Sequence, residues 1–198
     1  MQCRKPPRKV DTTLPIHKVA GSVILRIFSI AAAVIFAALL GYAATRPDTF
    51  RVERTASIKA PPEQIFPHIN DFHRWSAWSP WEKLDPAMKR NYGGLNPGVG
   101  SSYSWTGDNK VGAGRMEILT SEPPLKIVIK LDIARPFDGH HTAEFTLAGK
   151  GDVTEVTWAM YGPSPYAAKL IGLFLSMDRT VGRDFETGLA NLKAVVEK

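Results

Sequence analysis

The pattern of hydrophobic and polar positions divides the chain into one long apolar segment and a later part made of short alternating segments. Residues 27–45 form a run of 19 residues without a charged side chain. At about 1.5 Å per residue, a helix of this length spans roughly 28 Å, close to the thickness of a bilayer's hydrocarbon core. Because Arg26 can snorkel to the interface, residues 23–25 extend the run. We therefore predict a transmembrane anchor at residues 23–46, which Pro47 ends.

The part after the anchor begins with a strand and a short helix. Residues 50–60 place apolar side chains at alternate positions, which predicts a strand. The sequence PPE at residues 61–63 favours the first turn of a helix, which is predicted to continue to about residue 70. The aromatic stretch at residues 75–81 then predicts a second short helix or a tight loop.

From residue 88 onward, turn sequences separate about six antiparallel strands. The clearest strand is residues 126–134, where Ile127, Ile129, Leu131 and Ile133 share one face and charged residues occupy the other. The other alternating segments are residues 99–106, 112–121, 140–148 and 153–161.

One long amphipathic helix is predicted to end the chain. Ser164 suits the N-cap and Pro165 the first helical position, and apolar residues then recur at three- and four-residue steps to about residue 197. Ile171 and Phe174 fall on the stripe that faces the core, and Gly182 marks a bend or a close contact. Strands grouped apart from helices indicate an α+β fold, in which a curved sheet holds the helix and leaves a cavity.

Five segments, in this order, resemble the helix-grip domain of the START-like (SRPBCC) superfamily, which includes the polyketide cyclase/dehydrase family. They are SIKAPPEQIF at 57–66, WSAWSPW at 75–81, GAGRMEI at 112–118, TEVTWAM at 154–160 and MDRTVGRDFETGLANLK at 177–193. The resemblance covers about residues 50–197. It implies a seven-stranded antiparallel sheet around the C-terminal helix, with a site for an apolar ligand. Superfamily members include lipid carriers, hormone receptors, cyclases and proteins with no assigned activity.

The domain organisation expected from these patterns has three parts. They are a basic leader at residues 1–22, the anchor at residues 23–46 and a START-like domain at residues 50–198.

The net charge of +6 is concentrated ahead of the apolar segment. Residues 1–26 carry a net +5 and the other 172 residues carry +1, so a charge-based nucleic-acid surface is not expected. By the positive-inside rule the leader stays cytoplasmic, which places the C-terminal domain in the periplasm or outside the cell. The alternative is a signal peptide cleaved near Ala43, which would release a secreted domain. The single cysteine, Cys3, excludes a disulfide framework.

Strand alternation also predicts which side chains face the expected cavity. Arg54 lies on the inward face of its strand and suits a carboxylate or phosphate head group. His141 lies on the inward face of its strand and suits general acid–base chemistry. The alternative for both is a place near a strand end, where the side chain reaches solvent. The predicted ligand-binding set is Arg54, Trp78, Tyr103, Trp105, Met116, Ile129, His141, Phe145, Trp158, Met160 and Asp178.

Within this set, Trp105, Met116 and Trp158 are the preferred lining residues, and the alternative for the aromatic residues is core packing. Asp178 is expected either to pair with Arg54 or to sit near water at a helix bend. The neighbouring residues 179, 183 and 184 are expected to form a solvated face. We predict no metal site, because adjacent His140 and His141 point to opposite faces of a strand. We also predict no cofactor and assign no catalytic residue.

Three functions are compatible with the sequence. The first is a membrane-anchored module that binds a hydrophobic small molecule or lipid without covalent chemistry. The second is an enzyme of cyclase or lyase type that acts on an apolar substrate in the same cavity. The third is a structural or interaction domain with a filled interior. The oligomeric state, the ligand and the pathway stay open.

Overall fold

The computed structural model describes residues 16–136 and 138–198, so residues 1–15 of the predicted leader lie outside the described part. The chain divides into two units, with the boundary between Thr45 and Arg46. Helix α1, Ile16–Ala44, belongs to the first unit. Within it, Leu25–Ala44 is long and apolar enough to span a membrane, a test that an N-terminal signal sequence also meets.

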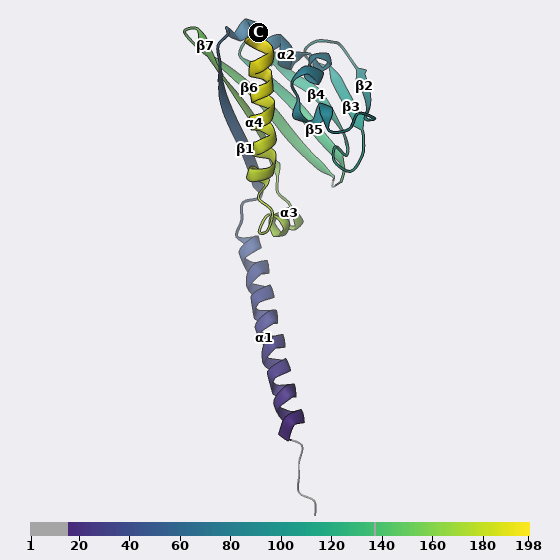
Figure 1. Cartoon of the computed structure of the whole chain (residues 1–198), viewed down its shortest axis with the longest axis vertical. Coiled ribbons are helices and arrows are strands. Elements are labelled where there is room, and N and C mark those ends of the chain that lie inside the picture. The colour runs from purple at the N-terminus through teal and green to yellow at the C-terminus, as the bar shows by residue number, and fades with distance from the viewer. Residues whose placement is uncertain (1–15, 137) are drawn as a thin grey trace, which may run out of the picture. The chain divides into compact units, whose positions relative to one another are not determined.

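The second unit is built on one seven-stranded antiparallel sheet (Figure 1). Its strand order is β1-β7-β6-β5-β4-β3-β2, so each strand from β2 to β7 lies beside its neighbour in the sequence. The strands are β1 Thr49–Ile58, β2 Lys89–Gly93, β3 Ser102–Thr106, β4 Ala113–Glu122, β5 Lys126–Arg135, β6 Gly139–Lys150 and β7 Val153–Pro163. The predicted α+β fold and the seven strands implied by the resemblance are confirmed.

The helical segments of this unit lie between β1 and β2 and after β7. They are α2 Pro62–Asn70, η1 Phe72–Ala77, η2 Pro80–Lys83, α3 Tyr166–Ile171 and α4 Met177–Val196. Helix α4 runs along β1, and Figure 1 shows it in front of the sheet. This arrangement of a sheet with a long C-terminal helix is the helix-grip architecture.

The prediction of a single helix from Ser164 to residue 197 is wrong in one respect, because the helix is interrupted after α3. Ser176 takes an extended backbone conformation, and its hydroxyl accepts the N–H of Arg179. A serine that caps a backbone N–H in this way starts a new helix. As a consequence Phe174, predicted to face the core, is 77% exposed, and Ile171 is also exposed.

The hydrophobic core of the second unit is complete within it. The buried residues of the core cluster all lie between Val52 and Leu192. They come from the inward faces of the strands, from the segment 62–78 and from α4. No member of this core cluster comes from α1, so we expect residues 46–198 to fold as one domain.

Candidate functional site

The strand register lines up the inward-facing side chains in rows that cross the sheet. The first row consists of Tyr92, Tyr103, Met116, Leu131 and His141. The second row consists of Ile118, Ile129, Ala143, Met160 and Val52. The third row consists of Ile127, Phe145, Trp158 and Arg54. Eight of the predicted ligand-binding residues therefore share three neighbouring rows on one face of the sheet.

Trp158, in the third row, is packed between aromatic rings. Its ring stacks on Phe185 of α4, with centroids 4.1 Å apart, and on Phe145, with centroids 4.9 Å apart. Three more indole rings approach it at steep angles, those of Trp75, Trp78 and Trp81. At this row, side chains occupy the space under α4 where the sequence predicts a cavity. The Trp158 Nε1 is buried and has no hydrogen-bond partner among the described residues.

The same face of the sheet stays partly open at the end nearer His141. Leu131 and His141 lie in the first row, and Trp105, Gly114 and Ile133 form the row beyond it. The Trp105 ring lies close over Gly114, where a β-carbon would come within 2.6 Å of the indole. The side chains of Trp105, Leu131, Ile133 and His141 are each only partly buried. We call these four side chains the open floor.

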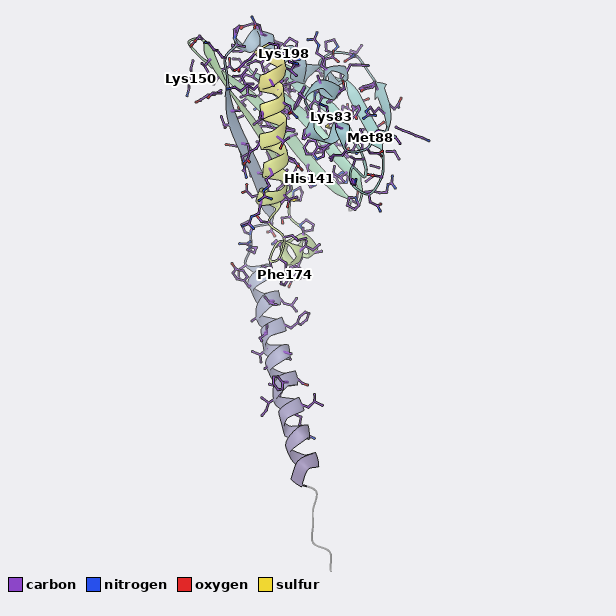
Figure 2. The ribbon with its side chains drawn as sticks, viewed as in Figure 1. Lys83, Met88, His141, Lys150, Phe174 and Lys198 are labelled. Atoms are coloured by element: carbon purple, nitrogen blue, oxygen red, sulfur yellow. The ribbon has the colours of Figure 1, made fainter. Side chains whose placement is uncertain are left out.

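His141 is the titratable member of the open floor (Figure 2). Its ring meets Phe50 edge-on, with centroids 5.2 Å apart, and its Nδ1 is buried without a partner among the described residues. Gly162 makes room for the ring, because a β-carbon there would lie 2.8 Å from Nδ1. Burial, followed by the nearby charge of His140, lowers the pKa of His141 below its ordinary value of 6.5. The imidazole is therefore neutral at neutral pH.

Arg54 lies between β1 and α4, and the pairing with Asp178 that the sequence suggested is present. Its guanidinium donates to the Glu186 carboxylate at 2.7 Å, the Glu53 carbonyl at 2.7 Å, the Asp178 carboxylate at 2.9 and 3.1 Å, and the Asp178 carbonyl at 3.0 Å. The bonds to the Asp178 and Glu186 carboxylates raise the pKa of Arg54. All five N–H donors of the guanidinium are thereby used, so none remains for a ligand head group. Gly182 allows this approach, because a β-carbon there would lie 2.0 Å from Nη2.

Tyr103 belongs to a buried polar cluster that the sequence analysis missed. Its hydroxyl donates to the Glu82 carboxylate at 2.6 Å, and Arg90 donates to the same carboxylate through Nε at 2.7 Å. The Glu82 side chain is only 6% exposed. Burial, followed by the bond to Glu82, raises the pKa of Tyr103, which keeps the phenol protonated. This cluster joins η2, β2 and β3, and no sequence motif predicts it.

The remaining predicted residues serve mainly as packing. Trp78 is fully buried and donates its indole N–H to the His68 carbonyl at 2.9 Å. Four more apolar residues of the predicted set are buried on the same face of the sheet. They are Met116, Ile129, Phe145 and Met160. They hold the sheet face on which the open floor lies.

Asp184 departs from the solvated face predicted for it. Its carboxylate is half-buried and accepts a hydrogen bond from the Trp81 side chain. Burial, as the larger effect, raises the pKa of Asp184 above its usual range. Arg179 and Arg183, which share its helix, are exposed as expected.

Two surface hollows are lined by residues other than those of the open floor. One, of about 190 Å³, is bordered by η1 and β2, and the other, of about 250 Å³, is bordered by α2 and the prolines at positions 97 and 123. None of the residues predicted to bind a ligand lines either hollow. In the part of the chain that the structure describes, no group of three His, Cys, Asp or Glu side chains is placed to hold a metal ion.

Comparison with known proteins matches this geometry to a family and to solved structures. The family described as "Polyketide cyclase / dehydrase and lipid transport" matches residues 49–197. Among curated proteins, no sequence matches the chain significantly.

Solved structures with the same fold share little sequence with this chain. Protein CV1439 from Chromobacterium violaceum is 16% identical, with 77% of this chain and 99% of that chain covered and a TM-score of 0.54. The di-domain ARO/CYC StfQ from the steffimycin biosynthetic pathway is 14% identical, with 75% and 51% covered and a TM-score of 0.57. Major latex-like protein 151 from Panax ginseng is 13% identical, with 76% and 99% covered and a TM-score of 0.54. These likenesses show the fold.

Proposed function

The chain belongs to the polyketide cyclase / dehydrase and lipid transport family, and on that premise we propose that it is a membrane-anchored module that binds a hydrophobic small molecule or lipid without covalent chemistry. The domain at residues 50–198 would hold the ligand, and residues 23–46 would hold the domain at a membrane. The family description names both lipid transport and cyclase chemistry, so binding of an apolar molecule is common to its members' stated roles.

The observation that supports ligand binding most strongly is the open floor. Three of its four side chains, Trp105, Leu131 and Ile133, are large and apolar, and all three remain partly exposed on the inward face of the sheet. Free energy is gained when a ligand removes a partly exposed apolar surface from water. The proposed contacts are therefore the open floor itself. Arg54 and Asp178 are left out of the proposed contacts, because they satisfy one another.

A charge on the open floor should abolish ligand capture. In residues 46–198 carrying Leu131→Glu, the carboxylate would have to be buried by an apolar ligand, which is costly. We expect native mass spectrometry to find a co-purified apolar molecule on the unsubstituted domain and none on Leu131→Glu.

The matched control for this experiment is Val128→Glu, on the same strand. Val128 is also partly buried, but strand alternation places it on the opposite face of the sheet. It should retain the molecule. Equal loss in both variants, or retention in both, would contradict ligand binding at the open floor.

The anchoring proposal rests on the apolar helix Leu25–Ala44 and the basic residues that precede it. We expect the full chain, expressed in a bacterium, to keep the mass of the uncleaved sequence, to float with lipid vesicles and to present residues 46–198 on the outer side of the membrane. Residues 46–198 alone should stay in the aqueous fraction. A mature chain beginning near Ala44 would instead show that the segment is a cleaved signal peptide.

A second candidate function, an enzyme of cyclase or lyase type, is favoured by one observation. His141 presents a neutral imidazole on the open floor, and a neutral imidazole can accept a proton from a substrate at neutral pH. A cyclodehydration would remove one water from the captured molecule. The enzyme hypothesis therefore expects the molecule bound to His141→Phe to be heavier by one water than that bound to the unsubstituted domain, whereas a simple binder gives equal masses.

A further inference from the structure

An exposed apolar cluster lies between β7 and α4, in the segment that the sequence pattern had assigned to the core. Of the ten exposed large hydrophobic residues in the described part of residues 46–198, five lie between Tyr166 and Met177. Phe174 is 77% exposed and Leu175 is 66% exposed, and Figure 2 shows Phe174 at the end of the domain where α4 begins. We call Ile171, Phe174, Leu175 and Met177 the apolar tip.

The segment that precedes the apolar tip is bonded to the first residues of the domain. The Asp48 carbonyl accepts the Ser164 N–H at 2.6 Å, and the Asp48 carboxylate forms an ion pair with Lys169 of α3. Thr49 and Pro163 face one another at the end of the β1–β7 pair. The segment that carries the tip is therefore fastened to the point where the domain's chain begins.

The covalent chain limits how far this point can lie from the end of the apolar helix. Asp48 follows Ala44, the last residue of the candidate span, by four residues. Four residues reach at most about 14 Å even when fully extended. If the helix spans a bilayer, Asp48 is held within that distance of the place where the chain leaves the hydrocarbon core, and the segment bonded to Asp48 is held beside it.

Two arginine side chains follow the apolar tip on α4. Arg179 and Arg183 lie one helical turn apart on the first turns of α4, and both are exposed. Neither guanidinium has an ion-pair partner within residues 16–136 and 138–198. The acidic neighbours Asp178 and Glu186 are both bound to Arg54. Apolar side chains next to free cations suit a surface of lipid head groups over acyl chains.

We propose that the apolar tip inserts into the surface of the same lipid bilayer that holds the anchor, with Arg179 and Arg183 at the level of the lipid phosphates. This proposal depends on the anchoring proposed above. The tether keeps the tip at high local concentration near the bilayer, so a small cluster suffices for insertion. Insertion would orient the domain so that the end carrying the apolar tip faces the membrane.

The test measures the lipid exposure of position 174 in the full chain. Cys3→Ser removes the native thiol, and Phe174→Cys then carries an environment-sensitive nitrobenzoxadiazole label. The chain is reconstituted in phosphatidylcholine vesicles with a minor share of phosphatidylglycerol and lipid-linked nitroxide. The matched control is the same label at Leu95→Cys, because Leu95 is 75% exposed and lies in the loop between β2 and β3.

We expect the label at position 174 to shift to the blue and to be quenched by the nitroxide lipid, and the label at position 95 to show neither effect. Adding Leu175→Glu and Met177→Glu should remove both the blue shift and the nitroxide quenching at position 174, whereas adding Leu119→Glu and Leu125→Glu, which are exposed elsewhere, should leave both effects in place. These side chains are exposed, so the fold should survive, and far-ultraviolet circular dichroism checks that it does.

Each contrary outcome has its own meaning. A chain that does not float with the vesicles overturns the anchoring, and the insertion with it. A chain that floats while position 174 is unquenched and reports water overturns the insertion alone. A blue shift at position 174 without quenching by nitroxide lipid means that protein, such as a second copy of the chain, covers the tip, and this also overturns the insertion.

Discussion

Replacing Trp158 with alanine is expected to lower the free energy of unfolding of residues 46–198 by about 3–5 kcal/mol. Trp158 is 2% exposed and stacks between Phe185 of α4 and Phe145 of β6. Its removal would leave a cavity at the contact that joins the helix to the sheet, where the ring lies so close to Gly188 that a β-carbon there would come within 2.7 Å of it. Urea denaturation followed by circular dichroism measures the change.

The control for this substitution is Trp158→Phe, which keeps an aromatic ring in the stack. Because the Trp158 Nε1 makes no hydrogen bond to the described residues, phenylalanine loses ring volume but no polar contact. We expect it to cost less than half of the alanine change. A loss below about 1 kcal/mol for Trp158→Ala would contradict the assignment of this ring to the centre of the core.

Replacing Glu82 with alanine should also lower the free energy of unfolding by about 3–5 kcal/mol. The Glu82 carboxylate accepts bonds from both Tyr103 and Arg90, and its side chain is almost fully buried. Alanine would leave the Arg90 charge and the Tyr103 hydroxyl without this acceptor in a partly buried place. Differential scanning calorimetry at neutral pH measures the loss.

Two further variants serve as controls for Glu82→Ala. Glu82→Gln keeps the shape and an acceptor for Tyr103 but removes the charge, so we expect a smaller loss. Glu53→Ala breaks the ion pair between Glu53 and Arg51. The Arg51 side chain is 49% exposed and the Glu53 side chain is 45% exposed, and an exposed pair of this kind contributes less than about 1 kcal/mol to the free energy of unfolding. Similar losses for Glu82→Ala and Glu53→Ala would show that the burial of the Glu82 cluster has no energetic consequence.

Much of the fold could be predicted from the sequence because strand alternation is a local signal. The alternation at residues 126–134 and 153–161 placed Ile129 and Trp158 on the buried face, where the structure has them. The break between α3 and α4 was missed for a physical reason. The apolar spacing continues through residues 171–177, and only the capping bond from Ser176 decides that a new helix starts there.

The candidate site could be predicted only in part. Alternation placed His141 and Trp105 on the inward face, but it could not say that the Trp158 row is filled by Phe185 while the row of Leu131 stays partly open. That difference depends on where α4 lies along the sheet. The bond between Glu82 and Tyr103 likewise joins segments 21 residues apart, and no local pattern encodes it.

An apolar ligand is proposed to lie on the open floor. The most direct test is to add a nitroxide-labelled fatty acid to isotopically labelled residues 46–198 and to map the broadening of backbone amide signals. We expect saturable broadening that is strongest around Leu131, Ile133 and His141 and weaker around Asn70 and Tyr92, which border the two surface hollows. Broadening centred on either hollow, or uniform broadening that never saturates, would contradict it.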